Sequence, residues 1–337
     1  MARAAELPEG AAQQRLLREG RIKTRGLMPD CSNYTYLAQV RADAGAETLA
    51  VYKPAPGETP LDDFPDGTLG KREVAAYLVS AALNWQVVPF TVYRDDGPMG
   101  PGSLQQFIVA DLREHYFSLM PARAADFRTL AAFDVIVNNA DRKSGHCLLD
   151  GDGHIWGVDN GLTFHALPKL RTVIWEFAGE EVAENLRRDA RQLATELVAG
   201  DGWVRDLKQL ISAAELRALA QRARRFADDG RYPEPTSRWA YPWPLIWREP
   251  GQRPAPTGRR GRPASIGSLS SSRRSHAGAA GGRSPAADSR SSRSGGSGCG
   301  VSSRQRSTKV PATSANFAVP NSSSPASCWS SIERYAW

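Results

Sequence analysis

Residues 138–164 read NNADRKSGHCLLDGDGHIWGVDNGLTF. Two short apolar runs, 147–149 and 155–158, flank the turn letters Asp-Gly-Asp-Gly, which predicts a two-stranded hairpin. Asp141 precedes the hairpin and Asp159 follows it, 18 residues later. Neighbouring strand ends would hold both carboxylates, one suited to accept a hydroxyl proton and the other to bind a metal ion. Two ordinary turns rich in Asp and Asn would have the same composition.

Two charged residues upstream extend this pattern. Lys53 ends a short strand expected at 49–53, and Glu73 lies near the start of a helix expected at 71–85. A lysine ammonium that projects from a strand suits nucleotide phosphates, and a glutamate could hold it in place. Taken singly, Lys53 would be an exposed lysine and Glu73 a favourable charge in a first helical turn. The order Lys, Glu, Asp, Asp favours one shared site.

Hydrophobic periodicity predicts strands in the first part of the chain and helices in the second. Further strands are expected at 35–41, 87–92 and 104–109, and further helices at 124–137, 180–198, 201–210 and 213–226. The order predicts an α+β fold with two lobes. We expect an N-terminal extension over 1–20, a strand-rich lobe over about 21–110 and a mostly helical lobe over about 111–248.

The charge of the chain is concentrated in its last quarter. The net charge is +7, but residues after 250 carry 13 Lys and Arg against Asp288 and Glu333, which leaves −4 for the first 250 residues. Residues 249–337 are rich in Ser, Arg, Gly and Pro without apolar periodicity, so a disordered basic tail is expected. A solvated tail without a dedicated partner is favoured over a nucleic-acid arm. A mistranslated extension of a GC-rich gene would have the same composition.

Some classes of protein are disfavoured by simple counts. The sequence contains no run of about 18 apolar residues, so a transmembrane helix is not expected. Residues 1–10 lack the apolar core of a secretory signal. Four widely spaced cysteines form no Cys-x-x-Cys motif, which disfavours a disulfide scaffold or a zinc knuckle. These features predict a cytoplasmic protein.

Four motifs follow one another in the chain: Lys53-Pro54, Arg72-Glu73-Val74-Ala75-Ala76-Tyr77, Asn139-Ala140-Asp141-Arg142 and Val158-Asp159-Asn160-Gly161-Leu162. In this order they resemble the phosphatidylinositol 3-/4-kinase-like superfamily. The resemblance covers about residues 27–226 and is nearest to the type II phosphatidylinositol 4-kinases and their actinobacterial relatives. It implies a protein-kinase-like bilobal fold with ATP bound between the lobes.

The resemblance also implies roles for individual residues. Lys53 would contact the ATP phosphates with Glu73 bracing it, Asp141 would be the catalytic base, and Asp159 would hold Mg²⁺. Lys143, beside Asp141, would stabilise the transferring phosphoryl group, although an exposed loop lysine would look the same.

The adenine and phosphate contacts follow by the same reasoning. Residues 105–109, with Gln106, Phe107 and Val109, would form the hinge that faces adenine. Ser32 and Asn33 lie where a phosphate-covering loop belongs, but the usual glycines are missing, and only Gly26 is near.

The second metal ligand departs from the superfamily pattern. His146 stands where an asparagine is usual, five residues after Asp141. Imidazole is a poor Mg²⁺ ligand. Either Asn139, Asn160 or water replaces it, or the metal is Mn²⁺, or catalysis is weak.

The function expected from these features is ATP- and Mg²⁺-dependent phosphoryl transfer to a hydroxyl acceptor, which would be a lipid, a protein or a small molecule. AMP transfer to a protein on the same fold is one alternative. A catalytically weak nucleotide-binding regulator is another, and no stable nucleic-acid partner is expected.

Overall fold

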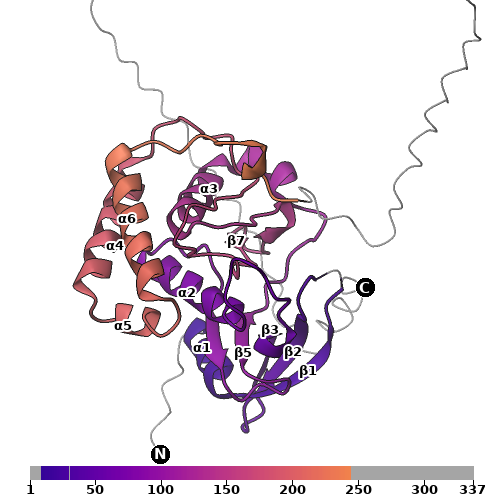
Figure 1. Ribbon diagram of the computed structural model, residues 1–337. Coiled ribbons are helices and arrows are strands. Elements are labelled where there is room, and N and C mark those ends of the chain that lie inside the picture. Colours follow the sequence, from indigo (N-terminus) through magenta and orange to yellow (C-terminus); the bar gives the residue numbers. More distant parts are fainter. Residues whose placement is uncertain (1–8, 30, 244–337) are drawn as a thin grey trace, which may run out of the picture. The chain divides into compact units, whose positions relative to one another are not determined.

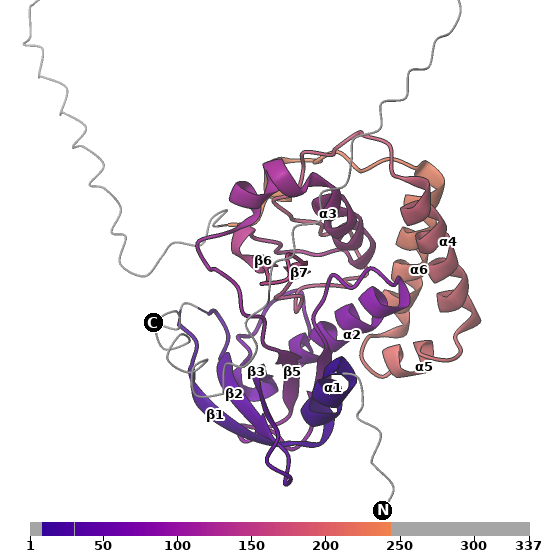
Figure 2. The same ribbon diagram turned by 180° about the vertical axis from the view of Figure 1, so that it is seen from behind.

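The computed structural model describes residues 9–29 and 31–243 (Figures 1 and 2). The expected tail over 249–337 lies outside the described residues. A five-stranded antiparallel sheet forms the first lobe, with the strand order β1-β2-β3-β5-β4. Its strands are β1 (Arg21–Leu27), β2 (Tyr36–Arg41), β3 (Glu47–Pro54), β4 (Thr91–Arg94) and β5 (Gly102–Gln106).

Strand β3 decides where Lys53 points. Ala50 and Tyr52 are fully buried, and they pack in a core with Val40 and Leu104. Side chains alternate between the two faces of a strand. Lys53 therefore projects from the opposite face, away from this core, where it meets helix α2 (Leu69–Ala82).

Part of the stretch predicted as an N-terminal extension forms a helix that packs on the sheet. Helix α1 (Glu9–Glu19) packs against strands of the sheet, and Leu17 is fully buried in the small-lobe core. Arg94 of β4 donates to the carbonyls of Leu17 and Gly20 at 2.9 and 3.0 Å. Residues 9–19 are thus an integral part of the lobe rather than an extension.

The strand predicted at 87–92 forms only in its last part, because β4 begins at Thr91. The Ser80 hydroxyl accepts hydrogen bonds from the main-chain N–H groups of Val87 and Val88, at 2.9 and 3.1 Å. Pro89 has no N–H to offer a neighbouring strand. The main-chain donors of residues 87–89 are therefore either satisfied by α2 or absent.

Helix α2 belongs to both lobes. It contacts β4 and β5, while its buried residues Ala75, Ala76 and Val79 join the large core that contains Leu130 and Phe133 of α3. Small side chains allow such close packing. In both ribbon views α2 lies between the sheet and the helices of the large lobe (Figures 1 and 2).

The second lobe is mostly helical, as predicted. It contains α3 (Tyr116–Val137), the hairpin β6 (Cys147–Leu149) and β7 (Ile155–Gly157), α4 (Glu184–Ala199), α5 (Val204–Leu207) and α6 (Ala213–Asp229). Helix α3 begins eight residues earlier than expected and is kinked at Arg123, shortly after Pro121. Among residues 9–29 and 31–243, no helix has the length and apolar character needed to cross a membrane.

Candidate active site

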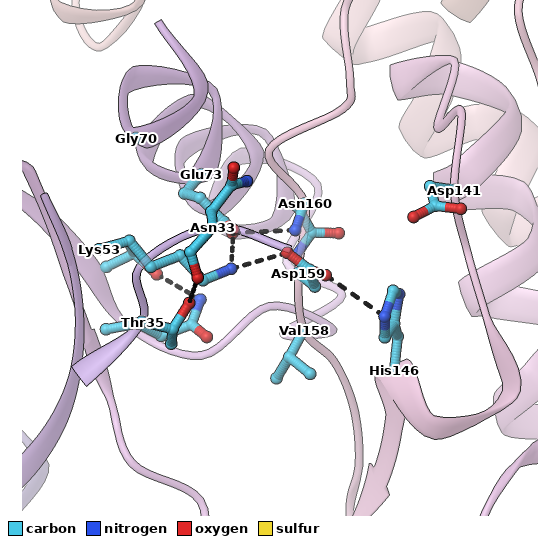
Figure 3. A network of polar contacts seen from close by, with 12 residues as sticks. Asn33, Thr35, Lys53, Gly70, Glu73, Asp141, His146, Val158, Asp159 and Asn160 are labelled. Carbon is cyan, nitrogen blue, oxygen red and sulfur yellow. Dashed lines mark hydrogen bonds and ion pairs between the residues drawn. The ribbon is translucent and has the colours of Figure 1, made fainter. Parts of the chain in front are cut away.

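Lys53 lies at the centre of an ion-pair cluster between the lobes (Figure 3). Its Nζ is 2.5 Å from Glu73 Oε1 on α2 and 2.7 Å from Asp159 Oδ1, 106 residues away in sequence. Burial alone would lower the pKa of Lys53, but the two carboxylates outweigh burial and raise it. Burial would likewise raise the pKa of Asp159, and Lys53 reverses this and lowers it. Lys53 and Asp159 are therefore both charged at neutral pH.

The turn at Asp159 aims its carboxylate into the cleft. Asp159 has φ 58°, a left-handed conformation that is uncommon for a residue with a side chain. The second carboxylate oxygen of Glu73 accepts the Asn160 N–H at 2.9 Å and so helps to hold the turn. The left-handed residue of this turn is thus Asp159 itself and not the glycine at 161. Gly161 lies close to Leu69 of α2.

Asp141 faces Asp159 from the large lobe (Figure 3). Its carboxylate is 2.7 Å from Lys143 Nζ, and its main-chain N–H donates to Asn139 Oδ1 at 2.9 Å. Burial raises the pKa of Asp141, and the charge of Lys143 opposes this only in part. A carboxylate with a raised pKa is a better proton acceptor than an ordinary aspartate.

A buried ion pair fixes the loop that carries Asp141. Arg142 and Asp134 of α3 are both fully buried, and their side chains meet at 2.9 Å. Arg142 also donates to the Val158 carbonyl at 2.6 Å and to Asn160 Oδ1 at 2.7 Å. One guanidinium thus joins α3, the Asp141 loop and the Asp159 turn. In the sequence, the available signal for this pair is the charged Asp134 among the apolar residues of the helix expected at 124–137.

Asn139 does not reach the cleft. It is fully buried, its amide oxygen accepts the Asp141 N–H, and its amide nitrogen donates to Asp134 Oδ1 at 3.1 Å. The Asn160 amide is also fully used: its oxygen accepts from Arg142, and its nitrogen donates to the Gly157 carbonyl. The structure therefore gives these two amides a positioning role in place of the metal-ligand role expected of Asn139.

His146 touches the Asp159 carboxylate, but its geometry does not suit metal binding. The main-chain N–H of Lys143 donates to His146 Nδ1 at 3.3 Å, so the ring proton sits on Nε2, 3.3 Å from Asp159 Oδ2. Burial lowers the pKa of His146 to about 4, so the ring is neutral at pH 7. A protonated Nε2 has no lone pair for a metal ion. His146 thus orients Asp159.

The fit of a divalent cation can be judged from these donors. Among the described residues, no cluster of three or more His, Cys, Asp or Glu side chains is arranged to hold a metal. Asp159 is half exposed and can offer carboxylate oxygen to the cleft. Mg²⁺ is commonly held by one or two carboxylates together with substrate phosphates and water. The residues therefore fit a cation shared with a nucleotide.

The loop at residues 31–35 is ordered by side chains in place of glycines. Asn33 Oδ1 accepts the Thr59 N–H at 2.7 Å, and the Thr59 hydroxyl donates to the Ser32 carbonyl at 2.8 Å. Ser32, Asn33 and Lys53 line one cleft with Asp159. The structure thus brings the predicted phosphate-loop residues to the same cleft as the charged cluster.

Glu58, which sequence reasoning missed, caps the N-terminus of α2. Its two carboxylate oxygens accept the N–H groups of Leu69 and Gly70 at 3.2 and 2.9 Å. The helix N-terminus carries unpaired donors and a positive dipole end, both of which a carboxylate satisfies. Thr68, at the usual capping position, makes no side-chain cap.

Replacing Glu58 by alanine is expected to lower the free energy of unfolding by about 1 kcal/mol, the usual cost of a lost helix cap. Urea unfolding followed by circular dichroism measures this. Asp62→Ala, at an exposed position of the same loop, should leave the midpoint unchanged. Equal midpoints for the two variants would show that Glu58 contributes no cap.

The predicted hinge crosses between the lobes, but two of its main-chain N–H groups are already hydrogen-bonded within the small lobe. The N–H groups of Gln106 and Phe107 donate to the carbonyls of Phe90 and Leu49 at 2.8 and 3.3 Å, so they are committed within the small lobe. Val109 is 62% exposed, and Ala110 bridges to Asp150 of the large lobe. Adenine would have to use carbonyls or later donors of this segment.

Taken together, the lobes and the charged cleft define a kinase-like fold. No family model matches the chain. The chain is 37% identical over 269 residues to Protein Rv2133c of Mycobacterium tuberculosis, a match that covers 68% of this chain and 94% of that protein. The chain therefore belongs to the same family as Protein Rv2133c.

Solved structures of kinases resemble the chain distantly. A hydra Fam20 structure with sugar has a TM-score of 0.41 at 11% identity and covers 64% of this chain and 86% of its own. A Golgi casein kinase structure has a TM-score of 0.40 at 11% identity, and the match covers 65% of this chain and 73% of that one. The Helicobacter pylori proinflammatory kinase CtkA has a TM-score of 0.35 at 10% identity, and the match covers 63% of this chain and 93% of that one. Likeness at this level says nothing of substrate.

Proposed function

We propose that this protein is an ATP-dependent phosphotransferase that moves the γ-phosphoryl group to a hydroxyl acceptor. The observation that carries the proposal is the ion-pair cluster of Lys53, Glu73 and Asp159, which faces Asp141 across one cleft. Phosphoryl transfer requires mainly positioning and charge neutralisation. The cluster offers a fixed cation and a carboxylate for a metal ion, and Asp141 offers a separate carboxylate base.

Each residue would have one task. Lys53, held by Glu73, neutralises the nucleotide phosphates. Asp159 would hold Mg²⁺ or Mn²⁺, and the bound ion would neutralise part of the phosphate charge. Asp141 accepts the proton of the acceptor hydroxyl as that oxygen attacks the γ-phosphorus, whose bond to the β-phosphate oxygen breaks and releases ADP. Lys143, 2.7 Å from Asp141, lies where it can balance charge on the moving group.

The acceptor is the least determined part of the proposal. The four motifs that resemble phosphatidylinositol 3-/4-kinases support testing lipids first, beside protein and small-molecule acceptors. The cytoplasmic location expected from the cysteine pattern is compatible with ATP as donor.

Labelled ATP tests the chemistry directly. The full chain is incubated with γ-³²P or α-³²P ATP and with Mg²⁺ or Mn²⁺, against phosphoinositide vesicles, a protein pool and polyols. Transfer of the γ label alone supports the proposal, with Asp159→Ala as the inactive control. Transfer of the α label would replace it with AMP transfer. If neither label moves and ATP gives no thermal shift, the proposal fails.

A further inference from the structure

Arg72, the neighbour of Glu73 on α2, is among the largest fully buried side chains of the described residues. Its Nη2 is 2.7 Å from Glu215 Oε1 of α6, and its Nη1 donates to the Thr163 carbonyl at 2.7 Å. Nε reaches Thr68 Oγ1 at 3.3 Å, and the guanidinium lies 4.9 Å from the ring centre of Phe64. A helix of the cleft is thus bound to the large lobe by a charged group.

Glu215 has two partners of different kinds. One carboxylate oxygen accepts the Ser212 N–H at 2.8 Å and closes the capping box of α6, while the other holds Arg72. Burial would raise the pKa of Glu215, but its hydrogen bonds and the charge of Arg72 lower it. The carboxylate is therefore charged when it meets Arg72.

Consecutive residues of α2 hold both ends of the segment that follows Asp159. Glu73 accepts the Asn160 N–H at the first end, and Arg72 donates to the Thr163 carbonyl at the second. Thr163 closes the turn internally, since its hydroxyl donates to the Asn160 carbonyl at 2.7 Å. Asp159 precedes this segment directly, so any shift of the segment changes where its carboxylate points.

We propose that Arg72 and Glu215 form an interlobe latch that positions the Asp159 turn. The meaning of this latch for catalysis rests on the proposed phosphotransferase function. Packing of Ala75, Ala76 and Val79 already attaches α2 to the large core, so the latch is not needed to hold the lobes together. Its specific contribution is to fix the Thr163 carbonyl, and with it the direction of Asp159. Arg72 is therefore a positioning residue.

Hydrogen exchange on the full chain tests the latch without requiring any activity. Glu215→Gln keeps an oxygen for the Ser212 N–H but loses the charge that binds Arg72. Arg72→Lys keeps the charge but cannot serve Glu215 and Thr163 together. In both variants we expect the amides of residues 160–163 to exchange about tenfold faster, the effect of replacing a charge-assisted hydrogen bond by a weaker one.

Ser212→Ala is the matched control, because it removes the α6 cap and leaves the Arg72 contacts intact. It should speed exchange at the start of α6 and leave residues 160–163 unchanged. If Glu215→Gln leaves 160–163 unchanged, or if Ser212→Ala speeds them equally, the latch is overturned.

The catalytic consequence has its own readout. The Mg²⁺ concentration that gives a half-maximal ATP-induced thermal shift should rise about tenfold in Glu215→Gln and Arg72→Lys, but not in Ser212→Ala. An unchanged requirement, together with fast exchange at 160–163, would overturn the link to Asp159. Absence of any ATP shift in the unmodified protein would instead overturn the proposed function, and the exchange result would still decide the latch.

Discussion

Asp134→Ala is expected to lower the free energy of unfolding by about 3–5 kcal/mol, because it leaves the Arg142 guanidinium buried without its carboxylate. Both side chains are fully buried at a separation of 2.9 Å. Arg142 would keep its bonds to the Val158 carbonyl and Asn160, but neither partner carries a compensating charge. Urea unfolding followed by circular dichroism measures the loss.

The same helix offers a control. Asp126 pairs with Arg123 at 2.7 Å, but both side chains are partly exposed. Asp126→Ala should cost less than about 1 kcal/mol, as exposed ion pairs do. Asp134→Asn keeps the shape of the side chain and one acceptor oxygen. Its loss in the free energy of unfolding should therefore lie between the losses of the two alanine variants. This loss can still be measured if Asp134→Ala does not fold. Equal losses at positions 126 and 134 would contradict the role given to the buried pair.

Asp141→Asn is expected to slow turnover by about 10²–10⁴-fold, the usual contribution of a positioned general base. An amide is isosteric with the carboxylate but accepts no proton from a hydroxyl. ATP binding should persist, because Lys53, Glu73 and Asp159 are unchanged. Single-turnover assays with γ-labelled ATP and an ATP-induced thermal shift separate the two effects.

The pH profile gives a second test of Asp141. The carboxylate must be ionised to accept a proton, and burial raises its pKa. Activity should therefore fall, as the pH is lowered, at a pH above the ordinary aspartate pKa. Asp152→Asn, in the exposed hairpin turn, should alter neither turnover nor profile. Full turnover in Asp141→Asn would remove Asp141 from the mechanism.

Much of the secondary structure was predictable because its signals are local. The strands at β2 and β3, helix α2, the β6–β7 hairpin and helices α4 and α6 all lie close to their predicted positions. Helix α1 and strand β1 were missed, since α1 buries little more than Leu17 and β1 is mostly exposed. A strand or helix with one weak apolar face gives little periodicity to detect.

Whether a contact within the site could be expected from the sequence depended on the range of the interaction. The contact of Lys53 with Glu73 joins a strand and the helix that follows it in the chain, and the structure contains it. The assignment of Asn139 to a metal ion did not anticipate that its amide would be consumed by Asp134 and the Asp141 N–H. The sequence alone does not distinguish a polar side chain that binds a ligand from one that is hydrogen-bonded to a neighbouring residue.

By itself, the sequence determined the order of the chemical groups and the hairpin that separates Asp141 from Asp159, because turn residues and alternation act over a few positions. Only the tertiary structure decided which of those groups face the cleft. It paired Arg142 with Asp134 and Arg72 with Glu215, and it placed His146 Nε2 3.3 Å from the Asp159 carboxylate. These pairings join residues on separate elements, and burial makes each depend on its partner, since a buried polar group without one is costly.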